Sequence, residues 1–127
     1  ETYDTLENTE NELKDIENNI DIVIFGSGDI GKLVSLYMLY SEKSVVAYAD
    51  NNEILWGKEL NQIPILKPER AVCLYPKAIY IVANETYFCD MRNQLLQISI
   101  DENNIIICND YNFFLKHILI KKLKDRG

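Results

Sequence analysis

The sequence has few of the side chains that usually carry catalysis or hold metal ions. It contains one histidine, His117, and three cysteines, none of them in a Cys-x-x-Cys spacing. An odd number of scattered cysteines favours neither a disulfide framework nor a zinc site. Because there is also no signal-peptide pattern, we expect a protein of the reducing cytoplasm. We expect His117 to be a half-buried structural histidine, and Cys89 and Cys108 to be core thiols.

Positive charge and long apolar runs are scarce as well. The sequence has 13 lysines and arginines against 20 aspartates and glutamates, which gives a formal net charge of −7. Nucleic-acid binding depends on cations that neutralise phosphates, so neither DNA nor RNA is an expected partner. The apolar stretch FFLKHILI at 113–120 is too short for a membrane-spanning helix and is interrupted by Lys116 and His117. We therefore expect no membrane span.

The sequence does have enough apolar residues for one domain core. Of its 127 residues, 47% are hydrophobic, and this length fits one ordinary domain. Residues 2–18 combine a narrow apolar stripe with many acidic side chains, which favours a linker or pairing helix. We therefore divide the chain into an N-terminal amphipathic helix at 1–19 and a nucleotide-binding domain at 20–127. Because the chain begins with Glu1, we expect a fragment of a longer protein.

Apolar runs alternate with segments of helical spacing along the second part. The runs are rich in β-branched residues and apolar throughout, which is typical of parallel strands buried on both faces. They lie at 20–25, 44–49, 78–83 and 104–108, with a short extended piece at 63–66. This alternation predicts a three-layer α/β fold, Rossmann-like, with a mostly parallel sheet of about four to five strands. If 63–66 pairs at an edge, the strand order is 3-2-1-4-5.

A glycine turn joins the first strand to the first helix. Its three glycines follow the pattern G-x-G-x-x-G. In a dinucleotide-binding turn, Gly26 makes the tight turn, Gly28 lets a pyrophosphate approach the backbone, and Gly31 lets helix and strand pack closely. The helix N-terminus offers free N–H groups to the phosphates. The predicted cofactor-binding residues of the turn are Gly26, Ser27, Gly28, Asp29, Ile30 and Gly31.

Polar residues also follow the second and third buried strands. Asp50 ends the strand at 44–49, where a carboxylate can accept hydrogen bonds from the ribose hydroxyls of an adenosine. No arginine is nearby to hold a 2′-phosphate, so NAD is favoured over NADP. Asn84 and Glu85 follow the strand at 78–83, at the sheet edge where α/β folds bind ligands. The predicted cofactor site therefore also includes Asp50, Asn51, Ala83 and Asn84.

The glycine turn has two other interpretations, a methyltransferase turn and a turn without a ligand. A methyltransferase turn has an acid at position 24 and a glycine at position 30, whereas both positions are isoleucine here. The second interpretation, a turn that closes a βαβ unit without binding a ligand, is not excluded by the sequence. The carboxylate of Asp29 even favours it, because an acid there stabilises a helix start but repels a phosphate. A Tyr-x-x-x-Lys pair for acid–base catalysis is absent. No catalytic residue is predicted, and whether the protein is an enzyme stays open.

Three segments resemble a Rossmann-type module of bacterial proteins that make or decorate surface polysaccharide: FGSGDIGK, VVAYADNNEILWGKELNQIPILKPERA and AIYIVANETYFCDMRNQLLQISI. Such modules accompany sugar methyltransferases of the FkbM type, glycosyl- and phosphosugar transferases, and sugar acyltransferases. The layout is more distantly similar to the NAD-binding domain of the repressor Rex and to CoA-binding domains. The resemblance implies NAD, a nucleotide sugar or no ligand, and it supplies no catalytic residue. Its matched positions are Gly26, Gly28, Gly31, Asp50 and Asn51.

The leading hypothesis is a nucleotide-binding module, for NAD or a nucleotide sugar, within a larger sugar-modifying or polysaccharide-biosynthesis protein. Its partner would be a small-molecule nucleotide, and it would not be catalytic by itself. A second hypothesis is a fragment of an NAD-dependent sugar dehydrogenase or epimerase. A third is a ligand-free structural module, which forms a homodimer or holds an attached catalytic domain through residues 2–18.

Overall fold

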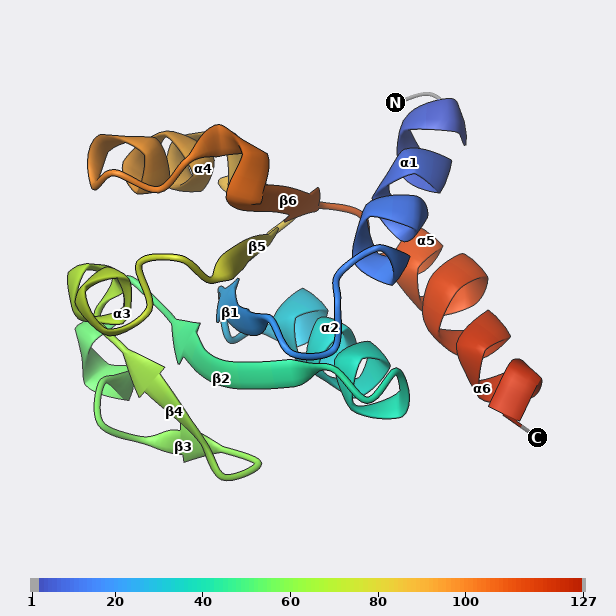
Figure 1. The fold of residues 1–127 in the computed structure, drawn as a ribbon, viewed down its shortest axis with the longest axis horizontal. Helices are drawn as coiled ribbons and strands as arrows, with labels where there is room; N and C mark the ends of the chain where they lie inside the picture. The colour runs from blue at the N-terminus through green and yellow to red at the C-terminus, as the bar shows by residue number, and fades with distance from the viewer. Residues whose placement is uncertain (1–2, 127) are drawn as a thin grey trace.

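The computed structural model describes residues 3–126 as a central sheet flanked by helices (Figure 1). The strands are β1 (Asp21–Phe25), β2 (Ser44–Ala49), β3 (Glu59–Leu60), β4 (Ile63–Leu66), β5 (Ile79–Ala83) and β6 (Ile105–Cys108). The α-helices are α1 (Tyr3–Lys14), α2 (Asp29–Tyr40), α3 (Pro68–Leu74), α4 (Phe88–Gln97), α5 (Tyr111–Phe113) and α6 (Ile120–Arg126). Shorter helical pieces are η1 (Glu53–Leu55), η2 (Glu102–Asn104) and the π-helical η3 (Phe114–Leu119).

The sheet has six strands in the order β3-β4-β2-β1-β5-β6. All its pairs are parallel except that of β3 with β4. Leaving β3 aside, this is the predicted order 3-2-1-4-5, and the predicted α/β class with a mostly parallel sheet is confirmed. The chain leaves β1 toward β2 on one side and later returns to β5 on the other side. Such a reversal opens a crevice at the carboxyl ends of the strands, where open α/β sheets bind ligands.

Both faces of the sheet are covered, which explains why β1 is apolar at every position but its first. Its residues 22–25 are fully buried, with alternate side chains entering two separate cores. One core lies under α1, α2 and the C-terminal helices, where the rings of Tyr37 and Phe114 meet edge to face at 5.8 Å. The other core lies under α3 and α4 and includes Met91 and Leu95. A strand between two such layers cannot show in–out alternation of polarity.

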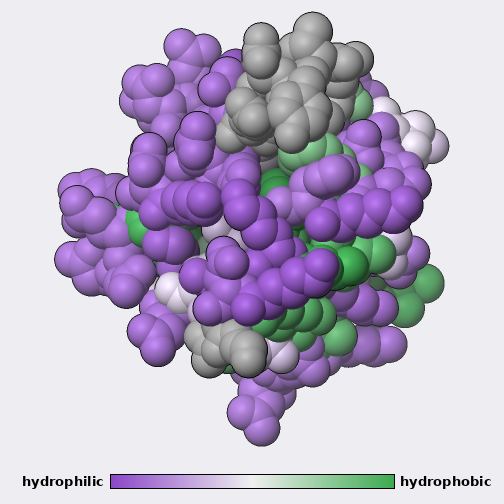
Figure 2. All heavy atoms as spheres, turned by 90° about the vertical axis from the view of Figure 1, so that its right-hand side faces the viewer, coloured by the Kyte–Doolittle hydropathy of each residue, from purple (hydrophilic) through white to green (hydrophobic). Residues whose placement is uncertain are grey.

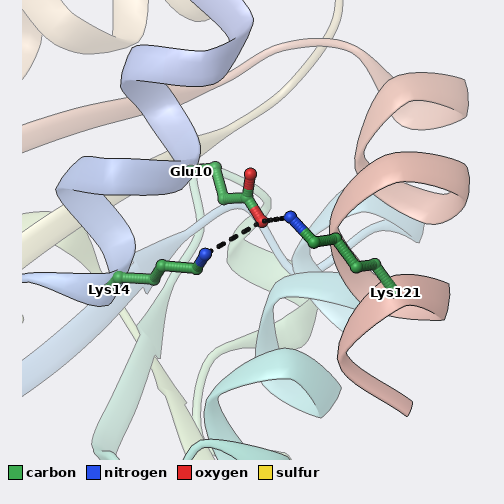
Figure 3. Close-up of polar contacts among 3 residues, drawn as sticks. All are labelled: Glu10, Lys14 and Lys121. Carbon is green, nitrogen blue, oxygen red and sulfur yellow. Dashed lines mark hydrogen bonds and ion pairs between the residues drawn. The ribbon is translucent and has the colours of Figure 1, made fainter. Parts of the chain in front are cut away.

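The helix predicted for residues 2–18 packs against the rest of the domain. Residue 2 lies outside the described residues, and α1 covers 3–14. Leu13 is fully buried, and Ile16 is 7% exposed. The carboxylate of Glu10 lies 3.5 Å from the ammonium groups of both Lys14 and Lys121, which joins α1 to α6 (Figure 3). Part of the apolar stripe therefore serves the chain's own core.

A lysine that follows α2 holds the end of α1 in place. The Lys43 ammonium donates to the carbonyl oxygens of Lys14 and Ile16 and to the side-chain oxygen of Asn18. These acceptors include carbonyls that the end of a helix leaves unpaired, so a cation there is favourable. Burial and the nearby Lys122 lower the pKa of Lys43. The contacts hold the end of α1 against the segment that joins α2 to β2.

Some expectations about local structure were wrong. The segment after Asn52, expected to be a loop with one extended piece, also forms the β3–β4 hairpin. The closing helix is interrupted by the π-helical segment η3. Cys89 is exposed instead of being a core thiol, whereas Cys108 is buried as expected. His117 is exposed and stacks on the ring of Phe113, with the centroids 5.0 Å apart.

Apolar side chains reach the surface on the side of the molecule that carries α1, α2 and α6 (Figure 2). On α2, Leu39 is 67% exposed and Leu36 is 39% exposed. On α6, Leu123 is 40% exposed and Ile120 is 37% exposed. Within residues 3–126, no helix is both long and apolar enough to cross a membrane.

Candidate functional site

A cavity of about 600 Å³ lies at the carboxyl ends of β1, β2 and β5, in the predicted crevice. Its volume is within the range of small-molecule sites. The structure brings together every predicted site residue but one: the lining includes Gly26, Ser27, Gly28, Asp29, Ile30, Asp50, Asn51, Ala83 and Asn84. Gly31 is not part of the lining. The lining residues Thr86, Tyr87, Met91 and Tyr111 were not predicted from the sequence.

Two of the three turn glycines are required by the fold itself. Gly26 has φ +112, and a Cβ there would lie 2.7 Å from the carbonyl oxygen of Ala83. A Cβ on Gly31 would lie 2.0 Å from the carbonyl oxygen of Gly26. Both distances are far below van der Waals contact, so any side chain would push the turn away from β5 or α2 from β1. These two glycines would be needed with or without a ligand.

Gly28 differs, because nothing in the described chain requires a glycine there. Its φ of −83 and ψ of −153 are extended values open to any residue. A Cβ added at Gly28 would meet no heavy atom within 4 Å. Gly28 is also the N-cap of α2 and forms no side-chain cap, although serine, aspartate or asparagine would stabilise the helix there. The missing side chain leaves open space in the cavity directly before a helix N-terminus.

Asp50 fastens the glycine turn to the end of β2. Its Oδ2 accepts hydrogen bonds from the backbone N–H of Ser27 at 3.0 Å and from the Ser27 hydroxyl at 2.7 Å. Its Oδ1 accepts one from the backbone N–H of Asn52 at 2.8 Å. A carboxylate has about four acceptor positions. Three hydrogen bonds within the chain therefore leave Asp50 about one position for a ligand.

The loop after β5 is held by two of its own side chains. Oδ1 of Asn84 accepts the backbone N–H groups of Thr86 and Tyr87 at 2.8 and 2.6 Å, which shapes the entry to α4. Oε1 of Glu85 accepts the backbone N–H of Tyr111 at 3.0 Å, which ties this loop to the first residue of α5. The loop thereby places Tyr87, which is 62% exposed, at the edge of the cavity.

A reciprocal amide pair forms a second link across the sheet edge. Asn51 donates to Gln94 at 3.0 Å, and Gln94 donates back to Asn51 at 2.8 Å. This pair joins the loop after β2 to α4, 43 positions further along the chain. Sequence spacing gives no sign of it, because a glutamine on a helix has many possible partners.

The cavity is acidic, and its only positive element is the backbone. Asp29, Asp50 and Glu85 line it, whereas no lysine or arginine of the described residues does. The N-terminus of α2 points its first N–H groups toward the space above Gly28, and these groups have no partner within a helix. Such an end suits phosphate groups that need no side-chain cation.

Cys108 and His117 do not line the cavity. Burial raises the pKa of the Cys108 thiol, so this group stays protonated at neutral pH. His117 lies in η3 and does not line the cavity. Within the part of the chain that the structure describes, no three histidine, cysteine or carboxylate side chains are grouped to hold a metal.

Comparison with known proteins gives one family and several structures. The family described as "C2185-like, N-terminal" matches residues 18–106. No curated protein sequence matches the chain. UDP-D-quinovosamine 4-dehydrogenase from Vibrio fischeri has 16% sequence identity and a TM-score of 0.59, over 79% of this chain and 86% of that one.

Crystal structures of RSP, a Rex-family repressor, are also similar. The complex with β-NAD+ and operator DNA has 17% identity and a TM-score of 0.54, and the match covers 85% of this chain and 62% of the repressor. The complex with β-NADH has 14% identity and a TM-score of 0.55, with 84% and 60% covered. The chain thus spans about three fifths of the repressor's length. At these identities the matches show a shared Rossmann-type fold.

Proposed function

We propose that this chain, which belongs to the C2185-like N-terminal family, is a module that binds a nucleotide with a free ribose, NAD in the first place. The ligand lies in the cavity at the carboxyl ends of β1, β2 and β5. Its phosphates bind the N–H groups at the start of α2, and the predicted turn and strand-end residues form the site.

The observation that carries this proposal is the open space at Gly28. Gly26 and Gly31 are explained by backbone contacts, so they do not distinguish a working pocket from a ligand-free turn. Asp50 is likewise explained in part by its hydrogen bonds to Ser27 and Asn52. Gly28 has no steric reason to be glycine, and serine, aspartate or asparagine would cap α2 slightly better. A phosphate approaching the backbone gives the glycine a purpose.

The lining favours NAD over ligands with additional phosphates. The acceptor position left on Asp50 suits a ribose hydroxyl, whereas its charge would repel a 2′-phosphate. CoA and NADP carry a further phosphate on the ribose, and no described cation lines the cavity to receive it. A nucleotide sugar, which has two phosphates and a free ribose, is the second candidate ligand.

The role of the module follows from the resemblance seen in the sequence. We place it in a larger bacterial, cytoplasmic protein of sugar modification or polysaccharide biosynthesis, where it is not catalytic by itself and has no nucleic-acid partner. Residues 1–19 then join or pair the module with its neighbours, and residues 20–127 bind the nucleotide. A fragment of an NAD-dependent sugar dehydrogenase is the alternative role.

A thermal-shift screen tests the ligand class. The protein is heated with NAD, NADH, NADP, UDP, UDP-sugars, GDP-sugars, CoA or S-adenosylmethionine. A ligand present at about 100 times its dissociation constant adds roughly 2.7 kcal/mol to stability. We expect a shift with NAD and a smaller or absent shift with NADP and CoA. No shift with any nucleotide would favour the structural module.

A further inference from the structure

The half of the cavity that lies away from Asp50 has the chemistry of a site for a positively charged ring. The strand order determines which residues lie there. Asp50 follows β2 on one side of the glycine turn, whereas Glu85 and Tyr87 follow β5 on the other side and Tyr111 follows β6. If the phosphates of a dinucleotide bind at the turn and one ribose binds Asp50, its second half extends toward Glu85, Tyr87 and Tyr111.

Glu85 brings a negative charge that no lysine or arginine of the described residues pairs. Its carboxylate accepts the neutral backbone N–H of Tyr111, which fixes its position without cancelling its charge. The ion pairs among the described residues involve Glu10 and Glu102, and none involves Glu85. A carboxylate held in this way favours a ligand group of positive charge.

Tyr87 and Tyr111 add aromatic surface to the same half. Tyr87 is 62% exposed, although its backbone is fixed by the hydrogen bond to Asn84. The ring of Tyr87 is therefore accessible to a ligand in the cavity. The face of a tyrosine ring attracts cations, ligand cations included. A carboxylate and two tyrosines that line the same half of a cavity are therefore a combination that selects for a cationic ring over a neutral one.

We propose that the site distinguishes the redox state of its ligand and binds NAD+ more tightly than NADH. This inference rests on the proposed function. The two ligands share their phosphates, riboses and adenine, so the glycine turn and Asp50 contribute equally to both. They differ in the nicotinamide ring, which is positively charged in NAD+ and neutral in NADH. Glu85 and the two tyrosines favour the charged ring by roughly threefold to thirtyfold in dissociation constant.

Calorimetric titration of the 127-residue protein with NAD+ and with NADH tests the inference. The same titrations are made with Glu85→Gln, which keeps an oxygen that can accept the Tyr111 N–H, and with Tyr87→Ala at an exposed position. Glu69→Gln is the matched control, because Glu69 is exposed on α3 and its replacement changes the net charge equally. Each titration is repeated in high salt, where electrostatic selectivity falls.

We expect NAD+ to bind at least threefold more tightly than NADH, and Glu85→Gln and Tyr87→Ala to bring the two affinities closer together. Glu69→Gln should leave their ratio unchanged. Equal affinities in the unaltered protein, tighter NADH binding, or an unchanged ratio in Glu85→Gln would overturn the inference while nucleotide binding stands. Binding of neither dinucleotide would instead overturn the proposed function on which it rests.

Discussion

The hydroxyl of Ser27 donates a hydrogen bond of 2.7 Å to the carboxylate of Asp50, 23 positions further along the chain. The backbone N–H of Ser27 donates to the same oxygen at 3.0 Å. One carboxylate thus holds the glycine turn against the end of β2. The residue expected to bind a ribose also determines the shape of the turn that would bind the phosphates, so fold and site depend on a common contact.

Replacing this carboxylate should affect stability as well as binding. In Asp50→Asn one of the two oxygens becomes an amide nitrogen, which cannot accept from Ser27 or Asn52. We expect a loss of about 1–3 kcal/mol in the free energy of unfolding, since hydrogen bonds to charged groups are lost. Ser27→Ala should cost less, about 1 kcal/mol, because the backbone N–H remains bound. Urea denaturation of both variants measures these values, and an unchanged midpoint for Asp50→Asn would contradict the assigned role.

The turn glycines should respond differently to alanine. Gly26→Ala places a Cβ near the Ala83 carbonyl at a positive φ, so we expect a loss of about 2 kcal/mol or more. Gly28→Ala enters open space at an ordinary φ and should change stability by less than about 1 kcal/mol. Thermal unfolding without ligand gives both values. A large loss for Gly28→Ala would mean that the fold does require this glycine.

The three cysteines should differ in reactivity. Cys73 and Cys89 are exposed, whereas Cys108 is 3% exposed and burial raises the pKa of its thiol. Because the thiolate is the reactive form, Ellman's reagent should modify Cys73 and Cys89 in the folded protein and Cys108 only after unfolding. Mass spectrometry of the labelled protein identifies the modified positions. Prompt labelling of Cys108 in the native protein would contradict the packing of β6.

Alkaline pH should destabilise the protein through three buried tyrosines. Burial raises the pKa values of Tyr37, Tyr48 and Tyr80, whose side chains are 0–2% exposed. A raised pKa in the folded state means that the stabilising contribution is complete below the unfolded pKa of about 10 and is lost as the pH rises above it. Each phenol then costs about 1.4 kcal/mol per pH unit until its folded pKa is reached.

Absorbance near 295 nm, followed together with circular dichroism, checks this expectation. The buried phenols should ionise only as the fold is lost. Ionisation of all tyrosines in a single transition near pH 10 without loss of structure would contradict the burial of these rings.

The sheet could be predicted from the sequence because its determinants are local. Continuous β-branched runs, as in β1 and β2, have no other stable place than between two layers of helices. The segment at 63–66 takes its predicted place beside β2, but it is not the edge strand, because β3 pairs with its other side. The β3–β4 hairpin was missed, because its turn uses Asn61 and Gln62 at positive φ without a glycine to mark it.

The candidate site was predicted only where it depends on the glycine pattern and strand ends. Gly28 and Asp50 follow from that pattern, and the structure places both at one cavity. Tyr87 and Tyr111 reach the same cavity through the hydrogen bonds of Asn84 and Glu85. Those contacts join residues across the fold, so periodicity and spacing carry no sign of them. Whether a helix residue such as Cys89 faces the core likewise depends on how the helix is rotated.

The measurement that tests the account most directly is the affinity for NAD of the unaltered protein and of Gly28→Val, determined by calorimetry. The account predicts measurable binding by the unaltered protein and a loss of at least roughly a hundredfold in Gly28→Val, because a side chain there fills the space the phosphates need. Circular dichroism should show that the variant keeps its fold, since the site is open in the free protein. Equal affinity in the two proteins, or no binding by either, would contradict a nucleotide site at the glycine turn.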